Sequence, residues 1–122
     1  MKVLVVDDDG AIRNVVSQML AVLGYEVLTA TNGREAIDMF DSGREYIDLV
    51  VTDLRMPVVD GYEVIRRIWS ISPNARIVCM SSHSPDANLE GATFLSKPFT
   101  LESLRDCVCR AALHSNSSPS AA

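Results

Sequence analysis

Short apolar runs of strand type alternate with segments of helical periodicity along almost the whole chain of 122 residues. The pattern predicts strands over residues 2–6, 25–30, 47–52, 76–80 and 93–95, and helices over 11–23, 32–43, 60–72 and 100–113. Such alternation builds a parallel sheet with helices on both faces and right-handed crossovers. We therefore predict one doubly wound α/β domain over residues 1–114, followed by a disordered tail over 115–122 that is rich in Ser, Pro and Ala.

Three of the predicted helices carry start signals. Asn32 and Asp60 each precede a helical pattern, and an acid follows each of them three positions on, at Glu35 and Glu63. This spacing is that of a capping box, in which side chains bond to the free N–H groups of the first turn. Thr100 occupies the equivalent place before the last helix. The amino ends of these helices are therefore predicted to within a few residues.

Bulk composition excludes several classes of protein. Apolar residues make up 48 % of the chain, which is enough to build a core at this length. The net charge of -5 disfavours direct binding to DNA or RNA, whose phosphates it would repel. No apolar run reaches the ~18 residues of a membrane span, and the first residues do not have the pattern of a signal peptide. We therefore expect a cytoplasmic protein with neither nucleic acid nor membrane as a partner.

The three cysteines are Cys79, Cys107 and Cys109. They form neither an even-numbered disulfide framework nor the paired Cys-x-x-Cys motifs of a zinc site. Cys107 and Cys109 are two residues apart on a predicted helix, so they point to different faces. We expect all three to be reduced and buried.

Polar side chains gather where the predicted strands end. In open α/β sheets, ligands bind beyond the carboxyl ends of the strands. The residues at these ends are Asp7, Asp8 and Asp9 after the first strand, Asp53 after the third, Ser81 and Ser82 after the fourth, and Lys97 after the fifth. Asp9 is expected to serve as a helix cap. The other acids, a hydroxyl and an ammonium group are predicted to share one cleft.

Three carboxylates in one cleft repel one another. At a separation of ~5 Å and an effective dielectric constant of ~20, the repulsion within each pair of carboxylates costs about 3 kcal/mol. Lys97 can neutralise only one of them, and a hard divalent cation such as Mg²⁺ is the natural remedy. A carboxylate nucleophile, a cation, a lysine and a hydroxyl are together the components of a phosphoryl-transfer site.

Four segments carry a resemblance to a known family: Leu4-Val5-Val6-Asp7-Asp8, Val51-Thr52-Asp53-Leu54-Arg55-Met56-Pro57, Asp60-Gly61 and Lys97-Pro98-Phe99. In this order at strand ends they resemble the receiver domain of two-component response regulators, with similarity to the single-domain chemotaxis type. The resemblance implies a five-stranded, flavodoxin-like sheet of order 2-1-3-4-5 with five helices. It also implies a phosphoacceptor that signals by conformational change and is not a turnover enzyme.

The resemblance further assigns roles to the residues of the cleft. Asp53 would accept the phosphoryl group, and Asp8 would ligate Mg²⁺ directly, with Asp7 acting largely through water. Asp53 itself and the backbone carbonyl of Arg55 would complete the protein ligands. Lys97 would pair with the phosphoryl group. The peptide bond between Lys97 and Pro98 would be cis, which would direct the lysine side chain into the site.

Other positions would transmit or limit the signal. Ser81 matches the switch hydroxyl and Phe94 the switch aromatic, while Arg55 and His83 occupy rim positions that tune dephosphorylation. The implied partners are a histidine kinase or a histidine phosphotransfer protein, and a downstream protein target or a fused effector.

One region departs from the family pattern. Only 16 positions separate Ser81 from Lys97, several fewer than receivers usually have. Ser84-Pro85-Asp86 is a good helix start, but Gly91 follows soon after. We therefore expect the fourth helix of the family fold to be shortened to one or two turns.

Two alternatives belong to other classes. Asp7-Asp8-Asp9-Gly10 mimics the Asp-x-Asp-Gly motif of haloacid-dehalogenase-like phosphatases, in which Asp7 would be the nucleophile. The short chain and the Asp53 segment fit that reading poorly. The second alternative is an interaction module that no longer depends on phosphorylation, and the intact set of acids, serine and lysine argues against it.

Overall fold

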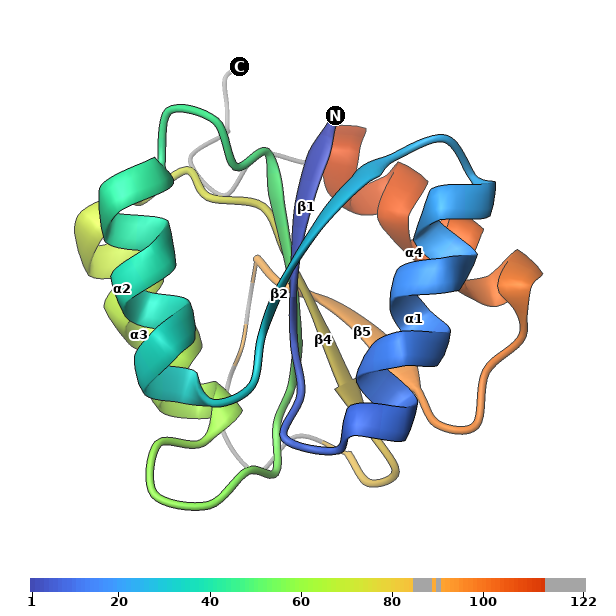
Figure 1. Ribbon diagram of the computed structural model, residues 1–122, viewed down its shortest axis with the longest axis horizontal. Helices are drawn as coiled ribbons and strands as arrows, with labels where there is room; N and C mark the ends of the chain where they lie inside the picture. Colours follow the sequence, from blue (N-terminus) through green and yellow to red (C-terminus); the bar gives the residue numbers. More distant parts are fainter. Residues whose placement is uncertain (85–88, 90, 114–122) are drawn as a thin grey trace.

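The computed structural model describes residues 1–84, 89 and 91–113. Five parallel strands form one sheet of order β2-β1-β3-β4-β5. The strands are β1 (Lys2–Val6), β2 (Glu26–Ala30), β3 (Leu49–Asp53), β4 (Ile77–Ser81) and β5 (Thr93–Ser96). The predicted sheet order is confirmed. Since β1 and β3 lie at the centre, the carboxyl ends of β1, β3 and β4 meet at one edge, the lower edge in Figure 1.

Helices cover both faces of the sheet (Figure 1). The described helices are α1 (Gly10–Val22), α2 (Gly33–Gly43), α3 (Gly61–Ile71) and α4 (Leu101–Leu113). The helices α2 and α3 lie side by side on one face, and α1 and α4 lie on the other. None of the described helices has the length and apolar character needed to cross a bilayer.

The core has two halves, one on each face of the sheet. Successive strand side chains point to opposite faces, so Leu4 and Val6 pack under α2 and α3 while Val3 and Val5 pack under α1 and α4. All four are fully buried. Continuous apolar strands of this kind are what a parallel sheet covered on both faces requires.

The predicted caps are present. Asn32 Oδ1 accepts the Glu35 backbone N–H at 2.7 Å, and Asp60 Oδ1 accepts that of Glu63 at 3.0 Å. Thr100 Oγ1 accepts the N–H of Ser103 at 3.1 Å. These bonds fix where α2, α3 and α4 begin, and therefore how the loops before them approach the strand ends.

Strand boundaries differ slightly from the predicted ones. Asp53 and Ser81 are the last residues of β3 and β4, where the sequence pattern ended both strands one residue earlier. Both side chains are therefore held by the sheet and are not part of a free loop. The short helix predicted after Ser84 and the tail predicted over 115–122 lie outside the described residues.

The prediction that all three cysteines are buried is wrong for Cys109, which is exposed; Cys79 and Cys107 are buried. All three are free thiols. Burial raises the pKa of the Cys79 thiol to about 11, and burial also raises that of Cys107. The thiolate is the reactive form of cysteine. Both buried thiols should therefore react slowly, because reagents cannot reach them and because the raised pKa keeps them protonated.

Iodoacetamide at pH 8 is therefore expected to modify one thiol of the folded chain quickly, and that thiol is Cys109. The Cys109→Ser variant should show no fast phase, and all three thiols of the wild type should react in denaturant. Mass spectrometry of the alkylated protein measures the count. Rapid modification of Cys79 in the folded state would contradict the packing of β4.

The loop between β3 and α3 contains a backbone outlier. Val58 has a φ of 68°, a region that β-branched residues rarely occupy. The Val59 N–H donates to Pro57 O at 2.8 Å across it, which makes Val58 the centre of a tight γ-type turn. The Val58 side chain is 103 % exposed, so no packing offsets the strain.

Replacement of Val58 by Asn is expected to raise the free energy of unfolding by about 1 kcal/mol, because Asn tolerates this backbone region and Val does not. The Val22→Asn variant is the control, since Val22 is also an exposed valine but lies in a helix. Urea titration followed by circular dichroism measures both. A destabilised Val58→Asn protein would show that this turn is not strained.

Candidate functional site: an acidic cleft at the strand ends

Three carboxylates and a lysine converge at the carboxyl edge of the sheet. One oxygen from each of Asp7, Asp8 and Asp53 lies within 4.8 Å of the others. Lys97 Nζ is 2.9 Å from Asp53 Oδ1 and 3.7 Å from Asp7 Oδ2. A cis peptide bond joins Lys97 to Pro98, as the resemblance implied. The structure therefore brings together the acids and the lysine that the sequence placed at separate strand ends.

Asp7 is the most confined member of the cluster, with an exposure of 1 %. Its Oδ1 accepts the Asp9 N–H at 2.9 Å, while its Oδ2 is buried and has no hydrogen-bond partner among the described residues. Burial raises the pKa of the Asp7 carboxyl, and the neighbouring Asp53 and Asp8 charges raise it further against the opposing effects of the Asp9 N–H and Lys97. A buried carboxylate oxygen with no donor calls for a cation.

The donor set fits a hard divalent cation. Carboxylate oxygens are the ligands that Mg²⁺ prefers, and it commonly takes one or two of them while it keeps several waters. Asp8 is exposed whereas Asp7 and Asp53 are buried, so the cluster has one side open to solvent. The three acids therefore form a group that could hold a metal ion, with Asp7 Oδ2 as the oxygen that most lacks a partner.

Ser81 lies at the end of β4, next to this cluster. The Lys97 N–H donates to Ser81 O at 2.8 Å, which ties the end of β4 to the segment that carries the lysine. Ser81 is buried, and its Oγ accepts the His83 N–H at 3.1 Å. His83 is exposed. The serine hydroxyl is therefore held at the strand end, with His83 just outside it.

Phe94 and Arg55, the other two predicted positions, lie outside the acidic cluster. Phe94 is half-buried on β5, opposite Cys79 of β4, and packs against the half of the core beneath α2 and α3. Arg55 is exposed in the loop after β3, where it lines a hollow of about 360 Å³ together with Pro57 and Tyr62.

Asp9 has the structural role that was expected of it. Its Oδ1 accepts the N–H groups of Ala11 at 2.9 Å and Ile12 at 3.4 Å and so caps α1. Two contacts of the site were not predicted. Arg13 donates from Nη1 to Asp7 O at 2.8 Å, and Gly61 lies directly against the backbone of Asp53. The sequence signal for the contact between Arg13 and Asp7 was the presence of an arginine in the first turn of the helix that follows the acids.

In the absence of metal, Asp8→Asn is expected to raise the melting temperature, because it removes one of three clustered negative charges. Solvent screens the exposed Asp8, so the gain is about 1 kcal/mol. Mg²⁺ should raise the melting temperature of the wild type and have little effect on the variant. Asp9→Asn is the matched control, since it removes a neighbouring charge but keeps a cap. A metal-free Asp8→Asn protein that melts below the wild type would contradict the repulsion.

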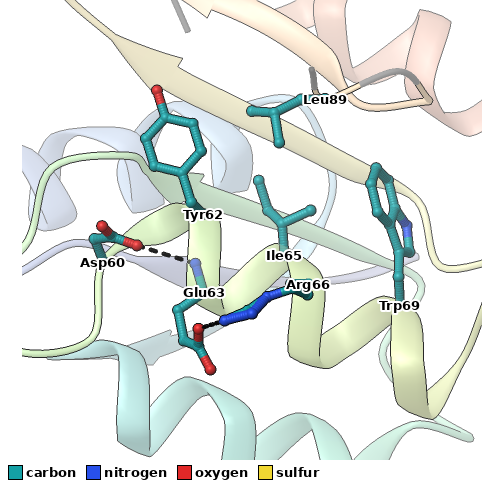
Figure 2. Close-up of a pocket in the computed structure, with 7 residues that line it drawn as sticks. All are labelled: Asp60, Tyr62, Glu63, Ile65, Arg66, Trp69 and Leu89. Atoms are coloured by element: carbon teal, nitrogen blue, oxygen red, sulfur yellow. Dashed lines mark hydrogen bonds and ion pairs between the residues drawn. The ribbon is translucent and has the colours of Figure 1, made fainter. Parts of the chain in front are cut away.

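A second hollow, of about 510 Å³, lies along α3 away from the acids. Tyr62, Ile65 and Trp69 project from α3 on one side of it, and Leu89 lies on the other (Figure 2). Glu63 pairs with Arg66 at its rim. No member of the acidic cluster lines this hollow, so it is separate from the cleft at the strand ends.

The fold and the cleft define a class of phosphoacceptor domain, and comparison with known proteins agrees. Residues 3–109 match the family described as the response regulator receiver domain. Sporulation initiation phosphotransferase F of Bacillus subtilis (strain 168) is 32% identical over 113 residues, which cover 88% of this chain and 90% of that protein. The DNA-binding transcriptional regulator NtrC of Azospirillum brasilense is 42% identical over 125 residues, but these make up only 25% of that protein and 98% of this chain.

Solved structures give the same result. The crystal structure of a receiver domain protein from Clostridium thermocellum has a TM-score of 0.85 at 32% identity and covers 92% of this chain and 94% of that one. The response regulator TrrA of Thermotoga maritima, in complex with Mg²⁺ and BeF, has a TM-score of 0.81 at 33% identity, with 90% and 97% covered. The chain belongs to the response regulator receiver domain family and is a phosphoacceptor domain of two-component signalling. Neither the phosphatase nor the phosphorylation-independent alternative is favoured.

Proposed function

We propose that Asp53 is the residue that takes the phosphoryl group, and that the acidic cleft binds Mg²⁺ when it does so. The observation that carries the proposal is the position of the Asp53 carboxylate. It stands at the end of β3, 2.9 Å from Lys97 Nζ and within 4.8 Å of oxygens from Asp7 and Asp8. The nucleophile Asp53, the positively charged Lys97 and the carboxylates of Asp7 and Asp8 therefore lie together in one cleft.

The assignment of metal ligands extends to this chain the roles that the resemblance to the receiver family implies. Asp8 is exposed and is proposed to bind Mg²⁺ directly, whereas Asp7 would act largely through water. Asp53 and the backbone carbonyl of Arg55 would complete the protein ligands. Bound Mg²⁺ would neutralise the charge of the cluster and of an incoming phosphoryl group.

The transfer itself is a displacement at phosphorus. An Asp53 carboxylate oxygen attacks the phosphorus atom as the bond from phosphorus to the donor breaks, and the donor leaves with its electron pair. The donor would be the phosphohistidine of a histidine kinase or a histidine phosphotransfer protein. Lys97 would pair with a phosphoryl oxygen and hold it in line. The domain modifies itself, so it is not a turnover enzyme.

The response to phosphorylation is proposed to pass through Ser81 and Phe94. A phosphoryl group on Asp53 adds acceptor oxygens beside Lys97, and the Ser81 hydroxyl can donate to one of them. In the unphosphorylated structure that hydroxyl accepts the His83 N–H, which leaves its own O–H available as a donor. Movement at the end of β4 would alter the space beside the half-buried Phe94 on β5 and so the surface offered to a downstream protein or a fused effector.

Arg55 and His83 are proposed to set how long the signal lasts. Both are exposed and follow the ends of β3 and β4 by two residues, so they stand at the rim of the cleft. Water must approach phosphorus opposite the Asp53 oxygen. A guanidinium there can bind phosphoryl oxygens but has no acceptor with which to orient water. Slow autodephosphorylation is the consequence.

Incubation with acetyl phosphate and Mg²⁺ tests the function. Intact-mass spectrometry should show the addition of one phosphoryl group, and hydroxylamine should remove it because the product is an acyl phosphate. Addition of EDTA before the donor should suppress the reaction. A chain that folds and binds Mg²⁺ but gains no mass would contradict the proposal.

A further inference from the structure

Three hydrogen bonds hold Asp7, and its remaining oxygen, Oδ2, has an ion pair with Lys97 Nζ at 3.7 Å. Its backbone N–H donates to Ala30 O at 3.3 Å, its Oδ1 accepts the Asp9 N–H at 2.9 Å, and its backbone carbonyl accepts a hydrogen bond from Arg13 Nη1 at 2.8 Å. The fourth polar atom, Oδ2, is buried without a hydrogen-bond partner among the described residues and belongs to the acidic cluster. The three bonds aim this one oxygen into the cleft.

Resting on the metal site of the proposed function, we infer that Arg13 is a positioning residue, which holds the turn of Asp7 and Asp8 in the geometry that binds Mg²⁺. Of the three bonds that fix Asp7, the Arg13 bond alone comes from another residue's side chain. The other two use backbone donors that every residue except proline supplies. Among these three hydrogen bonds, the one from Arg13 is therefore the one that the choice of amino acid controls.

The placement of Arg13 suits this role. It is half-buried on the first turn of α1, and its guanidinium folds back along the helix towards the strand end. A Cβ atom on Gly10 would lie 3.4 Å from Nη2, so the group rests against the backbone of that turn. A side chain that links the start of α1 to the end of β1 resists movement of the residues between them, which are Asp7, Asp8 and Asp9.

The positive charge of Arg13 acts in the opposite direction, because it disfavours a cation nearby. Two features weaken that effect. The group is partly exposed, so solvent screens it. It also lies close to Glu35: hydrogen bonds from Thr31 lower the pKa of the Glu35 carboxyl, and the Arg13 charge lowers it further. The loss of position is therefore expected to outweigh the relief of charge.

Calorimetric titration of the metal-free protein with Mg²⁺ tests the role. Arg13→Met keeps the aliphatic stem and removes both donor and charge, and it should bind Mg²⁺ about tenfold more weakly, as loss of a supporting contact to a metal ligand typically does. Arg13→Gln keeps an N–H donor on a shorter side chain, so its affinity for Mg²⁺ should lie between those of the wild type and Arg13→Met. Arg34→Met, an exposed arginine on α2, is the control and should bind as the wild type does.

Stability without metal separates this role from a general effect on the fold. If Arg13 acts by holding the acids in place, Arg13→Met should weaken Mg²⁺ binding at a temperature at which the metal-free variant is still fully folded. Melting without metal verifies that the variants fold, and Arg13→Gln carries the test if Arg13→Met does not. Equal or tighter Mg²⁺ binding by these variants would overturn the role of Arg13 alone. A wild type that binds no Mg²⁺ would overturn the metal site and this role together.

Discussion

Asp53→Asn is expected to take up no phosphoryl group from acetyl phosphate under conditions in which the wild type becomes singly modified. The amide is a poor nucleophile and carries no charge, so the reacting group is lost while the shape of the side chain is kept. The buried site at the end of β3 and the 2.9 Å contact with Lys97 mark this carboxylate out among the acidic residues that the structure describes. Intact-mass spectrometry after a fixed incubation gives the result directly.

Asp38→Asn is the matched control for this experiment. Asp38 is an exposed aspartate on α2 with an ion pair to Arg34 and no contact with the cleft. It should be phosphorylated at the wild-type rate. An equal mass gain in Asp53→Asn and the wild type would show that the reactive carboxylate lies elsewhere, and peptide mapping would then locate it.

Gly61→Ala is expected to destabilise the fold by about 3 kcal/mol, the upper part of the usual range for overpacking. A Cβ atom at this position would lie 2.2 Å from the carbonyl oxygen of Asp53 and 2.6 Å from Leu54 Cα. These are backbone atoms, so no side-chain rotation relieves the clash. The Gly61 N–H also donates to Leu54 O at 3.0 Å, which fixes the approach. Because the strained atoms belong to Asp53 itself, phosphorylation should slow as well.

Gly43→Ala is the comparison that isolates the clash. A Cβ there would meet Ile47 Cδ1 at 3.5 Å, an ordinary contact, and the position ends helix α2. That variant should match the wild type or gain up to about 1 kcal/mol from helix propensity. Thermal melts of the two variants, side by side, decide the matter. If Gly61→Ala melted at the same temperature as Gly43→Ala, α3 would be able to move away from β3 at little cost in free energy.

The main residues of the cleft could be predicted because they follow from local patterns, whereas the sheet order was predicted from the resemblance to the receiver family. Five apolar runs, four of them followed by a segment of helical period, indicate a parallel sheet. Once the strands are known, Asp7, Asp53 and Lys97 are expected to lie close together, because the carboxyl ends of all the parallel strands lie at one edge of the sheet.

Features that depend on tertiary contacts could not be predicted in the same way. The Gly61 motif was recognised, but its reason is a distance of approach between α3 and β3 that no local pattern encodes. Arg13 reads as an ordinary polar helix residue until its path back to Asp7 is seen. Cys109 is exposed because it lies ~200° around the helix from the buried Cys107, and only the packing of α4 decides which of the two faces inward.

Trp69 gives the protein a single optical reporter. It is the one tryptophan in the chain, and its indole N–H donates to Ala75 O at 3.0 Å, so the ring is anchored at the far end of α3 beside the hollow shown in Figure 2. The ring does not line the acidic cleft, so an ion bound there cannot quench it by contact. Any change in emission on adding Mg²⁺ or a phosphoryl donor must therefore be transmitted through the protein, and one direct route is α3, whose first residue rests on the backbone of Asp53. A stopped-flow fluorimeter can thus time the arrival of the conformational signal at α3 separately from the chemistry that starts it.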